Sequence, residues 1–188
     1  MSMFKIALAL SMVLGSQAFA SVSATGNTYD MPAASAANRA KVACTPLNAD
    51  CTKINSESLP ATLATLVNQS TMINTLQADG QQLLVFQGVR RAGTRVGVHY
   101  HEYGGHSCVL SGEITDYVEG QAPSKFPAGT CYYMPPWTLM SATNLGSEDA
   151  VLIDTFVVPP DKPFITIVEE NLVQGYFGGA SHLPPPSY

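Results

Sequence analysis

The sequence predicts an all-β fold, a sandwich or barrel built from short strands. Two observations support this prediction. Apolar and β-branched residues recur in short runs across 81–168, and glycines or prolines separate most of these runs. Such spacing, with glycine and proline at the turns, is typical of β-sandwiches and β-barrels. The length of 188 residues fits a single domain of this kind.

The first twenty residues have the pattern of a secretory signal peptide. Lys5 carries the only charge, an apolar run covers 6–14, and Ala18 and Ala20 mark a cleavage site. We therefore expect cleavage between Ala20 and Ser21 and an exported protein, periplasmic or extracellular. The apolar run is short for a membrane span. The alternative to a cleaved signal peptide is an N-terminal membrane anchor that the protein retains. No later segment predicts stable insertion into a membrane.

Residues 21–56 are rich in Ala, Ser, Asn and Thr without an apolar period, which predicts an irregular N-terminal extension. The domain itself is expected to span 57–175, followed by a Gly- and Pro-rich tail over 176–188. The segment 59–77 has partly helical spacing but many Thr and Val residues. We expect a short helix or turn there, followed by a strand.

The β pattern is strongest after residue 81. Gly112 and Gly120 enclose one short run, and the pairs Pro135-Pro136 and Pro159-Pro160 end two others. The expected strands cover 83–90, 95–102, 107–110, 113–118, 129–134, 150–158 and 164–168.

The charge balance argues against nucleic acid as a partner. The chain has 9 basic and 14 acidic residues, a net charge of −5. Loss of Lys5 with the leader would bring the net charge to −6. Arg90, Arg91 and Arg95 form the only basic grouping, and three charges do not make a nucleic-acid-binding stripe.

Export permits disulfides, and four cysteines allow three pairings. Cys44 and Cys51 are close in sequence and precede the strand-rich region, so we favour this pair. Cys108 and Cys131 then either pair with each other or stay as buried thiols. The spacing of the four matches neither a zinc knuckle nor a redox CxxC motif.

The densest metal-binding chemistry lies in the segment 93–112. His99 and His101 are one residue apart in an expected strand, so both imidazoles point to the same face. Imidazole suits zinc, copper, iron and nickel. The alternative is a hydrogen-bonded pair of histidines in a metal-free pocket.

The spacing around these histidines resembles the two motifs of the cupin family. The matching positions are Gly93, His99, His101 and Gly112 in the first motif, and Gly129, Pro135 and Asn144 in the second. The resemblance covers roughly 81–158. It implies a single cupin-type β-barrel, also called a double-stranded β-helix or jelly roll. Two family ligand positions differ here, because Gly105 stands at the glutamate and Met140 at the histidine.

The resemblance implies one divalent or redox transition metal, such as copper, iron, manganese, nickel or zinc, on His99 and His101. Met140 is either a further ligand, whose soft thioether favours copper, or a space-filling side chain. His106 is a further candidate for the missing ligand. Strict strand register turns His106 away from the pair, whereas a bulge at Gly104-Gly105 would turn it inward.

Other residues are candidates for the substrate pocket. Arg95 shares strand parity with His99, so it either lines the pocket and attracts an anionic substrate or forms a surface ion pair. Tyr103, Tyr132, Tyr133 and Trp137 are expected as pocket or core aromatics. Glu102 is one step out of register and is expected to be solvated or behind the ligands.

Three functions follow as expectations from this resemblance. The first is a metal-dependent, dioxygenase-like enzyme acting on a small organic substrate, with catalytic residues still to be identified. The second is a non-catalytic protein that binds a metal, for example copper, or a small molecule. The third is a metal-free cupin that binds a carbohydrate or another polar ligand. Cupins often pair through strands, so the resemblance also allows a homodimer.

Overall fold

The structure, a computed structural model, describes residues 49–169. These residues belong to the second of two compact units, Pro32–Tyr188, and the first unit, Met1–Met31, lies outside the described part. The expected signal peptide, most of the expected extension, Cys44 and the tail 176–188 also lie outside it. Among residues 49–169, no helix is long and apolar enough to cross a membrane.

The described residues form short strands after one turn of 3-10 helix. The elements in chain order are η1 (Ala49–Thr52), β1 (Lys53–Ile54), β2 (Glu57–Ser58), β3 (Thr62–Leu63), β4 (Val67–Leu76), β5 (Gln82–Arg90), β6 (Thr94–Arg95), β7 (His99–Tyr100), β8 (Gly105–Ser111), β9 (Glu113–Val118), β10 (Ser124–Pro127), β11 (Cys131–Met134), β12 (Met140–Thr143), β13 (Ala150–Val158) and β14 (Thr166–Ile167).

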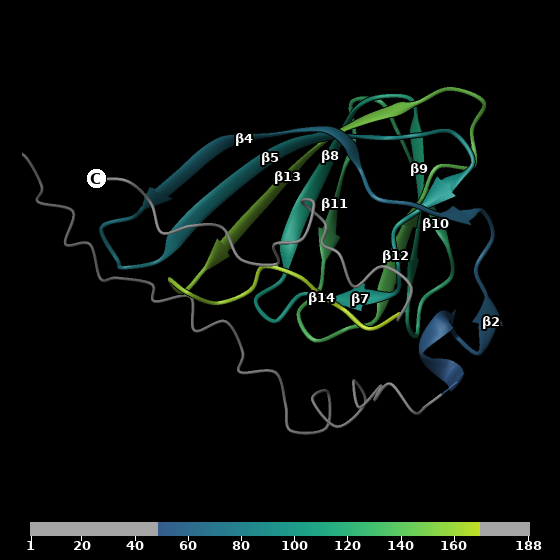
Figure 1. The fold of residues 1–188 in the computed structure, drawn as a ribbon, viewed down its shortest axis with the longest axis horizontal. Helices are drawn as coiled ribbons and strands as arrows, with labels where there is room; N and C mark the ends of the chain where they lie inside the picture. The colour runs from purple at the N-terminus through teal and green to yellow at the C-terminus, as the bar shows by residue number, and fades with distance from the viewer. Residues whose placement is uncertain (1–48, 170–188) are drawn as a thin grey trace, which may run out of the picture. The chain divides into compact units, whose positions relative to one another are not determined.

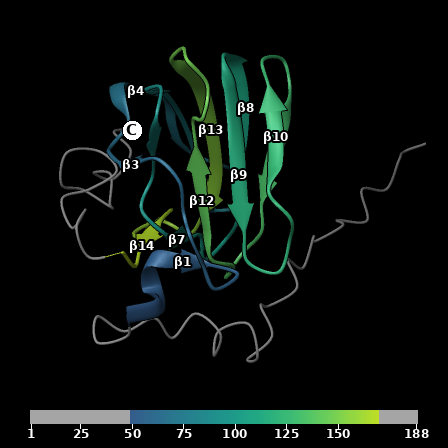
Figure 2. The same cartoon turned by 90° about the vertical axis from the view of Figure 1, so that its right-hand side faces the viewer.

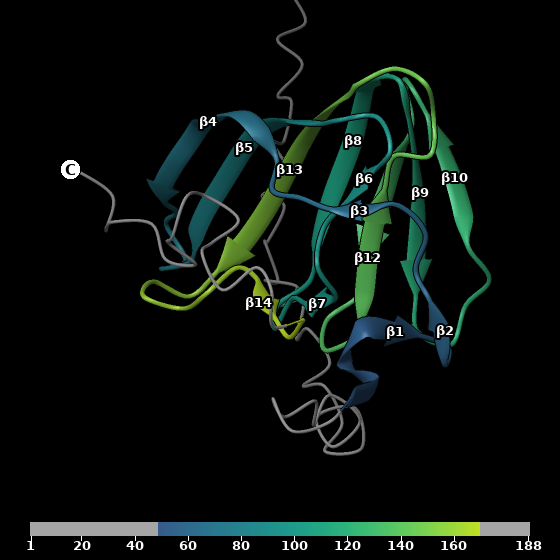
Figure 3. The same cartoon turned by 45° about the vertical axis from the view of Figure 1, so that its right-hand side comes forward.

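Most of these strands belong to two sheets. The five-stranded sheet has the order β11-β8-β13-β5-β4. The seven-stranded sheet follows β10-β9-β12-β6-β3, and β7 joins it by pairing with β12 and β14. Figures 1 and 3 show the sheets as separate layers, with β4, β5, β13 and β8 in one and β12, β9 and β10 in the other. Figure 2 shows β12, β9 and β10 side by side, as their pairings require.

The core lies between the two sheets. Alternate residues of β5 and β13 are buried, which is the pattern of strands with one face turned inward. Phe86 and Phe156 from these strands join one apolar cluster with Ile114 and Met140 from the other sheet. Full burial of such a side chain contributes about 1.5–3 kcal/mol. The apolar cluster therefore supplies a large part of the stabilisation of the sandwich.

The all-β fold class predicted from the sequence is confirmed. β9 and β13 have the predicted bounds, and β5 begins one residue earlier than expected. The strand expected within 59–77 is present as β4, but the helix considered before it is wrong, because β3 lies there. The Thr and Val residues of this segment favour strands, and β4 pairs with β5 over most of its length.

Three further differences concern boundaries. The expected strand over 95–102 is broken into β6 and β7. β10 and β12 were not predicted, since each is only four residues long and lacks a clear alternation. The expected irregular extension 21–56 ends in η1 and β1, where Cys51 and Ile54 are buried.

Cys108 and Cys131 form a disulfide with an S–S distance of 2.06 Å. They are direct partners in the antiparallel pairing of β8 with β11, so the bond ties two neighbouring strands. Of the two alternatives for these cysteines, pairing is the one found. Cys51 is also disulfide-bonded, and its expected partner Cys44 lies outside the described residues.

Replacing both Cys108 and Cys131 by Ser is expected to lower the free energy of unfolding by about 3 kcal/mol. The bond spans 23 residues of sequence, and opening a loop of that size enlarges the unfolded ensemble. Urea unfolding of the oxidised wild type and the double variant measures the difference. An unchanged unfolding midpoint in the double variant would show that β8 and β11 are held together without the bond.

Candidate functional site

His99 and His101 lie at the centre of the candidate site. His99 is in β7, and His101 follows at an isolated bridge to Pro136. Both side chains are buried, with 4% and 2% exposure. Their ring centroids lie 5.0 Å apart in an edge-to-face arrangement. The structure thus brings together the two histidines that the sequence places one residue apart.

Each histidine has a backbone carbonyl as the partner of Nδ1. His99 Nδ1 lies 2.8 Å from the carbonyl oxygen of Gly97, and His101 Nδ1 lies 2.5 Å from that of Phe164. A carbonyl oxygen only accepts hydrogen bonds, so both Nδ1 atoms carry a proton. In a neutral ring Nε2 then keeps its lone pair. His101 Nε2 is buried and has no hydrogen-bond partner among the described residues.

Burial keeps both rings neutral. It lowers the pKa of His99 to about 3, with smaller contributions from His101 and Arg90 that act in the same direction. Burial also lowers the pKa of His101 to about 4, although the hydrogen bond to the Phe164 carbonyl offsets part of this shift. Both imidazoles are therefore unprotonated at Nε2 at neutral pH, which is the state that binds a metal ion.

Both rings line a small cavity of about 20 Å³. A cavity of this size holds about one water molecule, and by the same measure one ion but no organic molecule. Its other lining residues are Arg90, Val96, Tyr132, Met134, Ala142, Leu152, Asp154 and Phe156. Arg90 and Asp154 bring one basic and one acidic group to this wall. Burial raises the pKa of the Tyr132 phenol well above its usual value, and the nearby carboxyls of Asp116 and Asp154 add to the rise.

The segment 164–169, here called the C-terminal clasp, holds the strand that carries the histidines. Ile167 of β14 pairs with His99, and the Phe164 carbonyl accepts the hydrogen bond from His101 Nδ1. The Glu169 carboxylate accepts hydrogen bonds from the Arg95 guanidinium at 2.6 and 2.7 Å. It also accepts one from the backbone N–H of Val98 at 2.9 Å. Residues far apart in sequence therefore fix the His101 ring and the backbone that carries His99.

An aromatic ring occupies the place of the acidic ligand of the cupin pattern. Gly105 stands at that position, and a Cβ atom added there would lie 2.6 Å from the ring of Phe156. The Phe156 ring in turn stacks on His101, with centroids 4.9 Å apart. The missing side chain at Gly105 thus makes room for an apolar cover over one histidine.

Met140 and His106 have different positions relative to the pair. Met140 is buried and lies opposite His99 in the pairing of β12 with β7, but it is not among the residues that line the cavity. His106 is exposed on the other face of β8, where its ring lies 5.2 Å from that of Tyr133. The pairing of β8 with β11 is regular there, so no bulge turns His106 inward. Within residues 49–169, no three His, Cys, Asp or Glu side chains form a metal-binding group.

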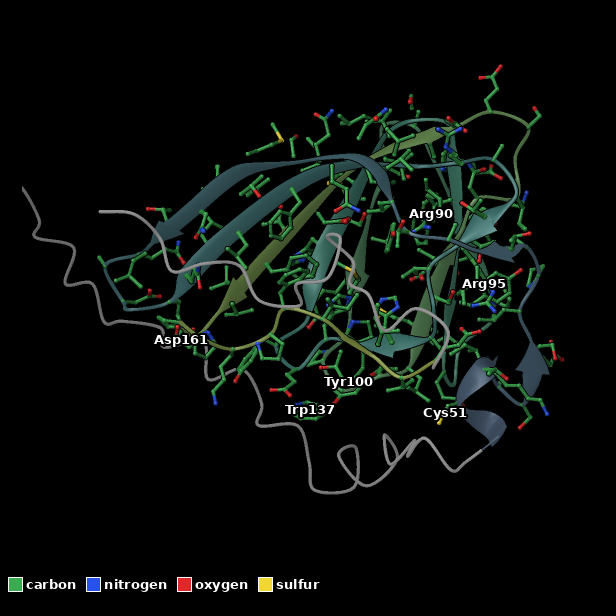
Figure 4. The ribbon with its side chains drawn as sticks, in the orientation of Figure 1. Cys51, Arg90, Arg95, Tyr100, Trp137 and Asp161 are labelled. Carbon is green, nitrogen blue, oxygen red and sulfur yellow. A yellow bond between two sulfur atoms is a disulfide. The ribbon has the colours of Figure 1, made fainter. Side chains whose placement is uncertain are left out.

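Three of the expected pocket residues do not line the histidine cavity. Arg95 is buried and paired with Glu169, because the strand breaks after Arg95 and Val96 takes the inward position. Tyr133 is half exposed and borders a different groove. Trp137 stacks on Tyr100 with centroids 5.3 Å apart. Figure 4 shows these two rings at the lower edge of the view, away from Arg90 and Arg95.

Sequence reasoning missed the polar residues of the cavity wall. Arg90 and Asp154 occupy inward positions of β5 and β13, in strands whose other inward residues are largely apolar. A polar residue at an inward position of a strongly alternating strand is the signal that would have found them. Tyr132, in contrast, was expected among the pocket or core aromatics, and it lines the cavity from an inward position of β11.

No protein-family model matches the chain, and no curated protein matches it. Solved structures do resemble it. A Klebsiella pneumoniae protein with a double-stranded β-helix domain is 20% identical, with 54% of this chain and 84% of that chain aligned and a TM-score of 0.44. An RmlC-like cupin family protein of Methanocaldococcus jannaschii is 19% identical, with 54% and 91% aligned and a TM-score of 0.42.

A third similar structure is described as that of DMSP lyases. It is 17% identical, with 45% of this chain and 43% of that chain aligned and a TM-score of 0.39. The solved structures that resemble the chain include cupin and double-stranded β-helix proteins. Cupins are the family whose two motifs the sequence resembles.

Proposed function

We propose that this chain is a metal-binding protein whose His99 and His101 hold one transition metal ion. A single observation carries the proposal. Both buried imidazoles donate Nδ1–H to backbone carbonyls, which leaves the lone pairs of both Nε2 atoms for a ligand. This arrangement of a carbonyl behind each ring is the one that metal-binding histidines commonly have, because it fixes the tautomer and the ring orientation.

The residues present fit a metal with open coordination positions. His101 Nε2 is an orphaned buried acceptor at a cavity with room for one ion. Asp154 in the wall favours a cation, whereas Arg90 in the same wall opposes it. A bound transition metal would supply a Lewis acid or a redox centre. The chain would contribute the two imidazoles, and Phe156 and Leu152 would keep bulk water away from them.

A metal-dependent enzyme is the first form of this proposal, and a non-catalytic metal-binding protein is the second. The size of the cavity favours the second form, since an organic substrate needs more space than about 20 Å³. Catalysis on a small organic molecule therefore requires the wall to open. Oxygen uptake by the metal-loaded protein with a panel of phenols and small acids distinguishes the two forms.

Replacing His99 and His101 by Gln is expected to reduce the metal content to background. Gln is close to His in size but lacks the imidazole lone pair. Metal content is measured by elemental analysis of wild type and variant after loading with Cu(II), Fe(II), Mn(II), Ni(II) or Zn(II) and removal of excess ion. Circular dichroism confirms that the double variant is folded.

Two matched variants sharpen this test. His106→Gln removes an exposed histidine on the outer face of β8 and is expected to leave the metal content unchanged. Met140→Leu keeps the volume of a buried side chain and removes only its sulfur. A weaker affinity for Cu(I) in Met140→Leu would make the thioether a ligand. Equal metal content in wild type and the His99/His101 variant would contradict the proposal.

A further inference from the structure

A second hollow lies between the edge strands of the two sheets. It has a volume of about 530 Å³, within the usual range for small-molecule sites. This hollow, here called the edge groove, is lined by Asp116, Val118, Gln121, Ala122, Ser124, Phe126, Cys131, Tyr132, Tyr133 and Pro135. They come from β9, β10 and β11, from the turn between β9 and β10, and from Pro135 just after β11. Tyr132 lines both the edge groove and the histidine cavity, so it forms a wall between them.

Asp116 is the polar group that distinguishes the edge groove. It lies on β9 with only 4% of its surface exposed, between the buried residues Ile114 and Val118. Its Oδ1 atom is buried and has no hydrogen-bond partner in the described part of the chain. No Lys, Arg or His is among the residues that line the groove. An acidic group is thus kept at the groove without a basic side chain to balance it.

A buried carboxyl without a cationic partner is costly to ionise. Burial raises the pKa of Asp116 to about 7, and a backbone hydrogen bond from Tyr117 offsets only part of this rise. A cation that enters the groove would relieve the cost, because it replaces the water that the carboxylate has lost. The groove therefore favours a positively charged ligand over a neutral one and excludes an anionic one.

The other walls of the groove select an organic cation over a bare metal ion. Val118, Phe126, Tyr132 and Pro135 present apolar or aromatic surface. The rings of Phe126 and Tyr132 lie 4.8 Å apart, and aromatic faces attract ammonium groups as well as apolar bodies. Within residues 49–169, Asp116 belongs to no group of three His, Cys, Asp or Glu side chains that could hold a metal ion.

We infer that the edge groove binds a small organic amine, whose ammonium group pairs with Asp116 and whose apolar body packs against Phe126 and Tyr132. The inference goes beyond the proposed metal site and does not depend on it. It concerns a ligand of roughly one aromatic ring and a short aminoalkyl chain, which a groove of about 530 Å³ can hold.

Three probes of similar size and different charge test the inference. We would titrate the full mature chain at pH 8, where Asp116 is ionised, with 2-phenylethylamine, 2-phenylethanol and 3-phenylpropionate. Isothermal titration calorimetry gives the affinities, and NMR chemical-shift changes locate the bound probe. We expect the amine to bind at least tenfold more tightly than the alcohol, with no binding of the carboxylate.

Three variants separate the role of Asp116 from a general effect on folding. Asp116→Asn keeps the shape of the side chain and is expected to weaken amine binding at least tenfold. Glu113→Gln removes an exposed carboxyl of the same strand, paired with Lys125, and should leave amine binding unchanged. Ala122→Trp fills the groove from an exposed position and should weaken binding of the amine without touching the core.

The outcomes divide cleanly. The expected order of probes, together with loss of amine binding in Asp116→Asn and in Ala122→Trp, supports the amine site. Equal binding of amine and alcohol would overturn it, and so would unchanged amine affinity in Asp116→Asn. Failure of the amine to bind the wild type at millimolar concentration would also overturn it. None of these results depends on the metal content, so they leave the proposal for His99 and His101 to its own test.

Discussion

Replacing Arg95 by Met is expected to lower the free energy of unfolding by about 3–5 kcal/mol. Arg95 and Glu169 form a doubly hydrogen-bonded ion pair whose side chains are only 10% and 7% exposed. The variant leaves the Glu169 carboxylate buried beside an apolar side chain. Uncompensated burial of a charge, rather than loss of the attraction itself, is the origin of the large effect.

Two further variants identify this origin. Removing both partners, as Arg95→Met with Glu169→Met, is expected to restore much of the lost stability, because no isolated charge remains. Lys125→Met breaks a more exposed ion pair, with Glu113, whose side chains are 67% and 36% exposed. We expect Lys125→Met to lower the free energy of unfolding by less than about 1 kcal/mol. Urea unfolding curves measure all three, and a similar cost for Arg95→Met and Lys125→Met would contradict the buried-charge explanation.

The stability difference between Asp116→Asn and wild type is expected to depend strongly on pH. Burial raises the pKa of Asp116 in the folded protein to about 7, from 3.8 in an unperturbed side chain. The folded state therefore holds its proton more tightly than the unfolded state does. This contribution to stability is complete below about pH 4 and is lost as the pH rises to about 7.

The Asn side chain does not titrate. The free energy of unfolding of Asp116→Asn should therefore increase relative to that of the wild type as the pH rises. The pKa shift of Asp116 corresponds to a change of at most about 4 kcal/mol, between pH 4 and pH 8, in the difference in free energy of unfolding between the two proteins. Urea unfolding of both proteins at several pH values measures it. Histidine titration is common to both proteins and cancels in the difference. A difference that stays constant from pH 4 to pH 8 would mean that Asp116 titrates like an exposed carboxyl.

The sequence predicts those parts of the fold that depend on local pattern. The alternation in β13 and β5 identifies inward and outward faces residue by residue, and both strands lie where the pattern predicts them. The histidine pair is also a local feature, since two residues of one short segment share a face. Short strands such as β12 have too few residues to show a period in the sequence. They are identified only in the structure, by their pairing with neighbouring strands such as β9.

The rest of the site depends on contacts between distant residues. Arg95 was expected on the face of His99, but the strand breaks between them and Glu169, 74 residues away, takes the guanidinium. Asp116 and Asp154 read in the sequence as ordinary acidic residues of β-strands. The alternation of β13 does place Asp154 inward, whereas β9 has no regular alternation, so the burial of Asp116 follows only from the facing sheet.

The C-terminal clasp has a consequence for the order in which the protein matures. Phe164, Ile167 and Glu169 hold His101, His99 and the strand before them, and they follow β1–β13 in the chain. A nascent chain that has emerged only as far as β13 has its two sheets but lacks the carbonyl that orients His101. The histidine pair can therefore be completed only after residues 164–169 have been made. If the chain is exported as an unfolded polypeptide, the metal ion proposed for His99 and His101 would be acquired in the compartment where folding finishes.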